Sequence, residues 1–364
     1  MGMQHEQIRE LSACATPLMS RPDGTVYVAT YYGNTLLLQT INGEENPSRW
    51  KLAHQSGQLK LEWTDTHSGM PNTAELLAAL EASFTSYPNQ HQLNLLAPVG
   101  QADELLRSGI LLRSENNQLI AYAELFWQQP RIWLASPQPY AFPPSYVLSQ
   151  GRRHPLRPPK PIGIVYQRHI SWLDRTLSFQ AVNIEYDLGR FSRWMNDPIV
   201  AATWREEGDL DKHRAYLENI AADPHVIGLI GCLDGEAFGY FEVYWAKEDR
   251  IAPFYDVDEF DRGWHVLIGE PRFRGKPFVT AWLPSMSHYL FLDDCRTQRV
   301  VIEPRSDNHK MIRNLAMCGY ANLKEFDFPD KHAMLGMLLR ERFFAERLWV
   351  PRDAVATSLS ANLF

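Results

Sequence analysis

A proline-rich stretch divides this sequence into two parts. Residues 137–163 read PQPYAFPPSYVLSQGRRHPLRPPKPIG, and eight of these 27 residues are proline. Proline lacks an amide hydrogen and fixes φ, so this stretch cannot form a helix interior or a central strand. We interpret it as a semi-rigid, extended linker; a loop wrapped on one domain is the alternative. We therefore expect an N-terminal domain over 1–140, a linker over 141–163, a second domain over 164–350 and a C-terminal tail over 351–364.

The composition predicts a folded chain. Hydrophobic residues make up 45% of the 364 residues and charged residues 22%, so a packed core is expected rather than general disorder. The formal net charge is −7 and no long basic run occurs, which argues against a nucleic-acid-binding surface. No run approaches 18 apolar residues, and the N-terminus lacks the apolar core of a signal peptide. We expect a cytoplasmic protein without a membrane span.

The cysteines and the common metal motifs give no sign of a metal or redox centre. The four cysteines, Cys14, Cys232, Cys295 and Cys318, form no CxxC pair. The last three stand in apolar settings, so we expect them to be reduced and buried. Neither HExxH nor G-x-S-x-G occurs, and residues 256–261 lack the glycine and terminal Glu of an EF-hand. No metal cofactor is therefore expected.

The first part of the chain predicts an α+β domain. Short segments of period two, separated by turn formers, fill residues 25–64 and indicate strands. Residues 73–86 form an amphipathic pattern capped by Asn72 or Thr73, which predicts a helix, and a second helix is expected over 101–108. No catalytic pattern precedes residue 135.

The second part alternates helices and strands. Helices are expected over 187–197 and 211–223, and the dipeptide Asp234-Gly235 predicts a hairpin between two strands. The full expected order is α, α, β, β, β, α, β, α, β, β. An α/β sheet layered with helices follows, with ligands expected where strands end and helices begin.

One strand-to-helix turn is basic and contains a glycine. The pattern R-x-x-G-x-P runs from Arg272 to Pro277 and includes Arg274, Gly275 and Lys276. A helix N-terminus offers unpaired amides and a partial positive charge, and a glycine lets a phosphate approach the backbone. The pattern is neither a Walker loop nor a Rossmann fingerprint. An ordinary surface turn with three basic residues is the alternative.

The strand before this turn carries His265, and the following strand carries Glu303 among Val and Ile. A carboxylate in an apolar strand is costly unless it is paired. If the two strands are neighbours, Glu303 could hold the imidazole and raise its basicity. Taken alone, a histidine in a strand is more often structural.

The motifs together resemble a known family. The blocks FSRWMNDP, GYFEVYWAKEDRI, FDRGWHVLIG, FRGKPF, TQRVVIEPRSDN and KEFDFPDKHAML are similar to the GNAT-superfamily N-acyltransferases of siderophore biosynthesis, particularly those that acetylate hydroxylysine for aerobactin. These blocks cover about half of the chain. The resemblance implies a GNAT fold with a splayed mixed sheet, preceded by a smaller α+β domain, which we interpret by analogy as a degenerate copy of the acyltransferase fold.

The resemblance also implies an activity, which is acyl transfer from acetyl-coenzyme A, or from another acyl-coenzyme A, to an N-hydroxylated lysine, ornithine or diamine, giving a hydroxamate for iron acquisition. It places His265 as general base, Glu303 as its partner and Arg274, Gly275 and Lys276 in the coenzyme loop. Asp330 and His332 stand where the family has His and Arg, which leaves their role open. Functional coupling to an amine N-hydroxylase and a siderophore synthetase is implied as well.

Several further residues are candidates for the two substrates. A backbone amide near Leu267, Ile268 and Gly269 could donate to the thioester oxygen. Acidic, aromatic and polar side chains could bind the amine: Trp204, Glu242, Tyr244, Trp245, Glu248, Asp249, Arg305 and Asn308. Strand alternation places Glu242 and Tyr244 on one face and Trp245 on the other. A solvated strand end is the alternative for the acidic members.

The chemistry agrees with a histidine base. The oxygen of a hydroxylamine withdraws electron density, so its nitrogen is largely unprotonated at neutral pH. A base is then needed only while the bond forms, which suits a histidine that titrates near neutrality. A non-catalytic partner-binding module and a general amine acetyltransferase remain as alternative functions.

Overall fold

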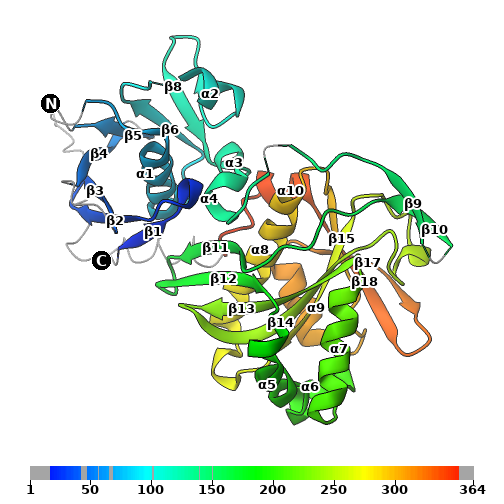
Figure 1. Cartoon of the computed structure of the whole chain (residues 1–364). Coiled ribbons are helices and arrows are strands. Elements are labelled where there is room, and N and C mark those ends of the chain that lie inside the picture. Colours follow the sequence, from blue (N-terminus) through cyan, green and yellow to red (C-terminus); the bar gives the residue numbers. More distant parts are fainter. Residues whose placement is uncertain are drawn as a thin grey trace, which may run out of the picture. The chain divides into compact units, whose positions relative to one another are not determined.

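The structure is a computed structural model that describes residues 17–41, 47–55, 57–64, 69–100, 102–138, 140–149 and 151–351. The chain forms two compact units, Met1–Trp133 and Leu134–Phe364, and Figure 1 shows the elements of each. None of the helices in the described ranges combines the length and apolar character that crossing a lipid bilayer requires.

The first unit is built on an eight-stranded sheet of order β1-β2-β3-β4-β5-β6-β8-β7. Its strands are β1 (Leu18–Ser20), β2 (Tyr27–Tyr32), β3 (Thr35–Thr40), β4 (Ser48–Gln55), β5 (Gln58–Trp63), β6 (Gln92–Leu96), β7 (Leu112–Arg113) and β8 (Leu119–Tyr122). Its helices are η1 (Pro22–Gly24), α1 (Thr73–Ser86), α2 (Ala102–Arg107), α3 (Ala123–Phe126) and α4 (Pro130–Trp133).

Helix α1 packs against β1, β2 and β3 and supplies the core of this unit. It begins where the sequence predicts, because Asn72 and Glu75 form a reciprocal capping box. The strands β5 and β6 are parallel neighbours, paired from Leu59 with Leu93 to Glu62 with Leu96. After Tyr122, the last residue of β8, the chain turns directly into α3.

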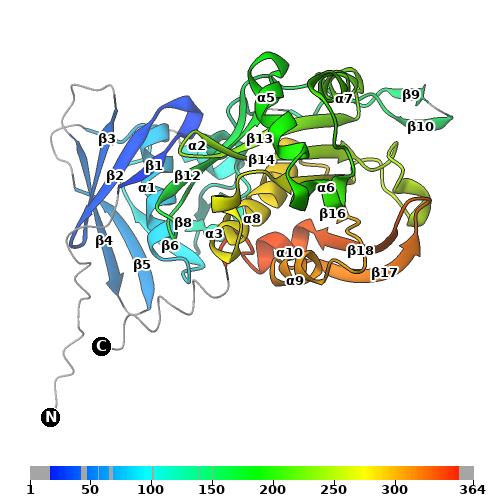
Figure 2. The ribbon, with the colours of Figure 1, turned by 90° about the horizontal axis from the view of Figure 1, so that it is seen from below.

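The second unit contains another eight-stranded sheet, of order β11-β12-β13-β14-β15-β16-β18-β17. Its strands are β11 (Ile164–Ile170), β12 (Arg175–Ala181), β13 (Val226–Leu233), β14 (Glu236–Trp245), β15 (Arg262–Ile268), β16 (Arg299–Ile302), β17 (Ala321–Asp327) and β18 (His332–Leu339). The helices are α5 (Ile184–Met195), α6 (Pro198–Trp204), α7 (Leu210–Ala222), η2 (Ala252–Phe254), η3 (Pro271–Phe273), α8 (Lys276–Asp293), α9 (His309–Met317) and α10 (Arg340–Ala345). Figure 2 shows α9 beside the β17–β18 hairpin.

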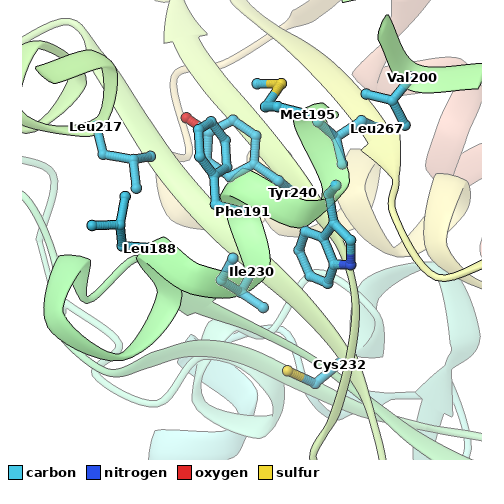
Figure 3. Close-up of a cluster of buried hydrophobic side chains, with 10 residues drawn as sticks. Leu188, Phe191, Met195, Val200, Leu217, Ile230, Cys232, Tyr240 and Leu267 are labelled. Carbon is cyan, nitrogen blue, oxygen red and sulfur yellow. The ribbon is translucent and has the colours of Figure 1, made fainter. Parts of the chain in front are cut away.

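Helix α5 buries an aromatic face against the sheet. The sequence places Phe191, Trp194 and Met195 on one side of this helix, and all three are buried. They belong to one cluster with Tyr240 of β14 and Leu267 of β15, and Figure 3 shows Phe191 and Met195 beside these two residues. This cluster fixes α5 over the middle of the sheet.

The two sheets share one connectivity. In each, the fifth and sixth strands are parallel neighbours (β5–β6 and β15–β16), and a helix, α1 or α8, connects them. In each sheet, the last strand in chain order (β8 or β18) lies between the sixth strand and the seventh, and the seventh strand (β7 or β17) forms the edge. The difference is that β2 and β3 meet in a tight turn at Gly33, whereas α5, α6 and α7 lie between β12 and β13.

The proline-rich segment packs along the second unit. It contains the hairpin β9 (Tyr146–Ser149) and β10 (Arg152–Pro155). Arg157 then forms two hydrogen bonds, of 2.5 and 2.6 Å, to the Glu248 carboxylate. Arg296 donates to the carbonyl of Phe142 at 2.8 Å. These contacts hold the segment against the loop that follows β14 and against the turn between α8 and β16.

The cysteines differ in their surroundings. Cys232 is buried in the α5 cluster, as the sequence predicts, and Cys318 is half-buried. The prediction for Cys295 was wrong, because this side chain is exposed. It lies in the turn between Asp294 and Arg296, whose ion pair spans the residue. Cys14 lies outside the described residues.

Candidate active site

Three neighbouring strands bring three titratable side chains together. The antiparallel register of β14 and β15 pairs Glu242 with His265. The parallel register of β15 and β16 pairs Gly263 with Val301, which brings His265 level with Glu303 two residues further on. Side chains two residues apart on a strand share a face, so the three lie on one side of the sheet.

The strands β15 and β16 separate at this point. Only Arg262 and Gly263 of β15 pair with β16, whereas β15 pairs with β14 along its whole length. The edge of β15 from Trp264 onwards is therefore not hydrogen-bonded to β16, and we call this unpaired stretch between the two strands the gap. His265 and Glu303 stand where this gap opens.

The His265 imidazole lies between the two carboxylates. Its Nε2 atom is 2.7 Å from Glu303 Oε1, and its Nδ1 atom is 3.4 Å from Glu242 Oε2. The Glu303 side chain is fully buried, while 28% of the histidine side chain is exposed. The pairing that the sequence predicted is therefore present, with Glu242 as an additional carboxylate.

Each carboxylate is held by tyrosines. Tyr244 donates to Glu303 Oε2 at 2.7 Å, while Tyr216 and Tyr240 donate to Glu242 Oε1 at 2.6 and 3.0 Å. Because every one of these donors is itself buried or half-buried, the carboxylate positions are fixed.

Gly263 gives Tyr244 the space it needs. A Cβ at position 263 would lie 2.2 Å from the Tyr244 ring. The absence of a side chain on β15 therefore lets the tyrosine lie across this strand and reach Glu303.

The carboxylates set the charge of the histidine. Burial opposes a charged imidazole, but Glu303 and Glu242 outweigh burial and raise the pKa of His265 to about 10. Burial alone would raise the pKa of Glu303, yet His265 and Lys331 hold it well below its ordinary value. The resting site therefore contains an imidazolium, which differs from the expected titration near neutrality.

The turn after β15 leads into the N-terminus of α8. Gly275 is the N-cap and has φ of 126°, a conformation that L-residues rarely adopt. Its own lack of a side chain leaves α8 without a side-chain cap, and a Cβ there would point into open space, with Pro277 Cδ at 3.9 Å. Lys276 is the first residue of the helix. The amides, the open space and the cation fit a diphosphate.

The two arginines of this turn have different partners. Arg274 donates to the carbonyl of Ile268 at 2.9 Å and lies 3.2 Å from Asp197, the N-cap of α6. Arg274 therefore stabilises the turn by linking it to the end of β15 and to the start of α6. Arg272, more exposed, pairs with Glu236.

Strand geometry determines which of the three predicted backbone amides could donate to the thioester oxygen. The amide of Gly269 donates to the carbonyl of Phe238 at 3.0 Å. Because antiparallel partners alternate in direction, the amide of Leu267 also points toward β14, and that of Ile268 points toward the gap. Of the three candidates, only Ile268 can donate to a group between the strands.

Some of the predicted amine-binding residues meet at His265. Glu242 and Tyr244 surround it, and the Trp204 ring stands edge-on to the imidazole with 6.5 Å between centroids. These three residues come from β14 and α6. They form a wall of the site on the face of the sheet against which α5 and α6 pack.

The other predicted residues have partners elsewhere. Trp245 is buried on the opposite face, with Arg157 at 4.3 Å and Arg262 at 4.0 Å from its ring. Glu248 binds Arg157, and Asp249 accepts from the amide of Ile251 at 2.9 Å.

Beyond β16, Arg305 pairs with Asp307 at 3.3 Å. Asn308 caps α9 through the amide of Met311 at 3.1 Å. These two side chains are therefore engaged by their own turn and do not join the His265 cluster.

Sequence reasoning missed three residues beside the site. They are Tyr216 of α7, Arg250 of the loop after β14, and Lys331 of the β17–β18 turn, which donates to the carbonyl of Glu303 at 2.7 Å. Lys331 and Arg250 each lie within one of the blocks quoted above, so their positions carried a signal. Tyr216 lies outside all of those blocks, and for this residue the sequence shows no comparable signal.

Comparison with known proteins gives consistent matches. A family model described as an acetyltransferase (GNAT) domain matches residues 183–328. The chain is 43% identical to the N(6)-hydroxylysine O-acetyltransferase of Escherichia coli, over 62% of this chain and 72% of that enzyme. It is 32% identical to a hydroxyornithine transacylase of Ajellomyces capsulatus, over 84% of this chain and 79% of that protein.

A third relative has a longer chain. The N(5)-hydroxyornithine:cis-anhydromevalonyl coenzyme A-N(5)-transacylase of Beauveria bassiana is 43% identical, over 52% of this chain and 43% of its own length.

Proposed function

Because the chain belongs to the GNAT acetyltransferase family, we propose that it transfers an acetyl group from acetyl-coenzyme A to the hydroxylamine nitrogen of an N-hydroxylated lysine, ornithine or diamine. The observation that carries this proposal is the His265–Glu303 pair, 2.7 Å apart where β15 and β16 separate. The names of the E. coli and A. capsulatus relatives support an N-hydroxylated amine as acceptor.

Acetyl-coenzyme A would supply the activated acyl group, and the N-terminus of α8 would bind its diphosphate. The amides around Gly275 and the Lys276 ammonium provide the positive potential. Arg274 keeps the turn in place through Ile268 and Asp197. The amide of Ile268 donates into the gap, where negative charge develops during acyl transfer.

His265 would remove the proton from the attacking nitrogen. Since the resting imidazole is charged, it must first lose a proton. We place that loss at Nδ1, because Nε2 is held by Glu303 at 2.7 Å whereas the Nδ1 contact to Glu242 is 3.4 Å. The neutral Nδ1 atom is then the base, and Glu303 stabilises the imidazolium that forms again.

Transfer to nitrogen and transfer to oxygen give different products. The name of the E. coli relative specifies an O-acetyltransferase. Transfer to nitrogen gives a hydroxamate, which binds ferric iron and produces a coloured complex, whereas an O-acyl hydroxylamine retains its basic nitrogen. An amine N-hydroxylase would supply the acceptor, and a siderophore synthetase would consume the hydroxamate.

The test combines thiol release from acetyl-coenzyme A with detection of the ferric hydroxamate complex. We expect both signals with hydroxylysine, hydroxyornithine, hydroxyputrescine or hydroxycadaverine, and neither with the matching unhydroxylated amines. Equal turnover of hydroxylated and unhydroxylated amines would indicate a general amine acetyltransferase. Thiol release without the ferric complex would indicate transfer to oxygen.

A further inference from the structure

An arginine at the edge of the candidate active site contacts two carboxylates at long range. Arg250 lies in the loop after β14, and its side chain is 49% exposed. Its Nη1 atom is 3.4 Å from Asp330 Oδ1, its Nη2 atom is 3.9 Å from Glu303 Oε1, and its guanidinium lies 4.7 Å over the Phe328 ring. The ring and the two carboxylates orient the guanidinium.

These contacts leave most of the hydrogen-bonding capacity of Arg250 unused. A guanidinium has five N–H donors in a planar fork that matches a carboxylate. Among the described residues, the one hydrogen bond recorded for this guanidinium is the long contact to Asp330. The neighbouring Lys331 differs, since its ammonium already donates to the carbonyl of Glu303 at 2.7 Å.

Arg250 also lies at a suitable distance from the proposed base. The same atom, Glu303 Oε1, is 2.7 Å from His265 Nε2 and 3.9 Å from Arg250 Nη2, so these two nitrogens cannot lie farther apart than the sum of these distances. The proposed base, Nδ1, is the other nitrogen of the same imidazole ring and lies on its Glu242 side. In hydroxyornithine and hydroxylysine the reacting nitrogen is separated from Cα by about 5–6 Å in an extended chain. A substrate with its hydroxylamine at His265 can thus extend its carboxylate to Arg250.

The local charge permits a second carboxylate. The His265 imidazolium neutralises one of its two carboxylate neighbours, and Lys331 adds a positive charge on the same side. Asp330, which is exposed, can release Arg250 to water at little cost.

We propose that Arg250 binds the α-carboxylate of the acceptor, so that the substrate is an N-hydroxylated α-amino acid and not an N-hydroxylated diamine. This inference rests on the proposed function and decides between the acceptor classes which that function leaves open. Arg250 is then a specificity-determining residue outside the acyl-transfer chemistry.

The experiment compares acceptors that differ only in the carboxylate. One pair is hydroxylysine with hydroxycadaverine, and the other is hydroxyornithine with hydroxyputrescine. For the wild-type protein we expect kcat/KM to be about 10- to 100-fold higher for the hydroxylated amino acid than for the matching hydroxylated diamine. This factor corresponds to the free energy that hydrogen bonds to a charged group typically contribute to binding. In Arg250→Ala this preference should be lost, chiefly through KM, with at most an about threefold change for the diamine derivative.

Two further variants separate binding from structural damage. Arg250→Lys keeps the charge and should restore part of the preference. Arg214→Ala removes an exposed arginine from α7 and should retain the wild-type preference.

Equal kcat/KM for both members of each pair in the wild-type protein would overturn the inference. The inference would also be overturned if the kcat/KM of the Arg250→Ala variant fell by the same factor for both members of a pair. If none of the four hydroxylamines is acylated, the proposed function itself fails, and this inference fails with it.

Discussion

At the scale of single residues, the site is governed by the charge on His265. Two carboxylates face one imidazole, and a buried tyrosine network fixes both of them. Such an imidazole is a stronger base than a free histidine but is mostly protonated at neutral pH. The two effects oppose each other, so the reaction rate should depend strongly on pH.

This dependence gives the first prediction. A base must be neutral, and the pKa of His265 is raised to about 10, so kcat/KM should keep rising through pH 7–9. Glu242→Gln removes one carboxylate, lowers the pKa of His265 and moves the rising limb to lower pH by roughly 1–2 units. The measurement is kcat/KM against pH for both proteins. An unmoved limb would show that the titrating group is not His265.

The second prediction concerns the histidine itself. His265→Gln keeps a polar side chain but cannot accept the proton, so kcat should fall by about 10²–10⁴. The KM for acetyl-coenzyme A should stay within about twofold, since the α8 N-terminus is unchanged. The matched control is His91→Gln, an exposed histidine of the first unit, which should leave kcat unchanged. A comparable loss in the control would reveal a general effect on folding.

The sequence could predict part of this residue arrangement. His265 and Glu303 stood out because a titratable group in an apolar strand requires a partner. Trp245 and Glu248 were misplaced as substrate contacts because the sequence could not show that the proline-rich segment covers them. Arg250 was missed because its position depends on two loops, far apart in sequence, meeting over Glu303.

At the scale of elements, the turn between β15 and α8 joins the two halves of the site. It carries Ile268 at the end of the strand and Gly275 at the start of the helix. Local sequence rules predict such turns well, as they do the β13–β14 hairpin at Asp234-Gly235, where both residues have positive φ. The separation of β15 from β16 is not local, and here only the family resemblance indicated it.

The third prediction tests this turn. Gly275→Val imposes a side chain at φ of 126° and places it at the helix N-terminus, so the Kd for coenzyme A should rise by at least about tenfold. Isothermal titration of coenzyme A into the full chain measures this. Gly33→Val also places a β-branched side chain at a positive φ, here 60°, in an open turn of the first unit, and should bind normally. Unchanged affinity in Gly275→Val would place the diphosphate elsewhere.

At the scale of the whole molecule, the common strand order of the two units has a functional consequence. We infer that the first unit is a second copy of the acyltransferase topology without its site. Its fifth and sixth strands pair over four positions, from Leu59 with Leu93 to Glu62 with Leu96, so no gap opens between them. It also lacks helices equivalent to α5, α6 and α7 between β2 and β3.

The N-termini of the two corresponding helices lead to the final prediction. In α1 the Asn72 side chain accepts from the amide of Glu75 at 2.8 Å, so the capping box already satisfies donors that an anion would need. In α8 Gly275 provides no such cap. Coenzyme A should therefore bind the full chain with a stoichiometry of one, and Gly275→Val should weaken the whole of that binding. A second binding event, or a fraction of the sites that keeps full affinity in this variant, would show that the first unit also binds the coenzyme.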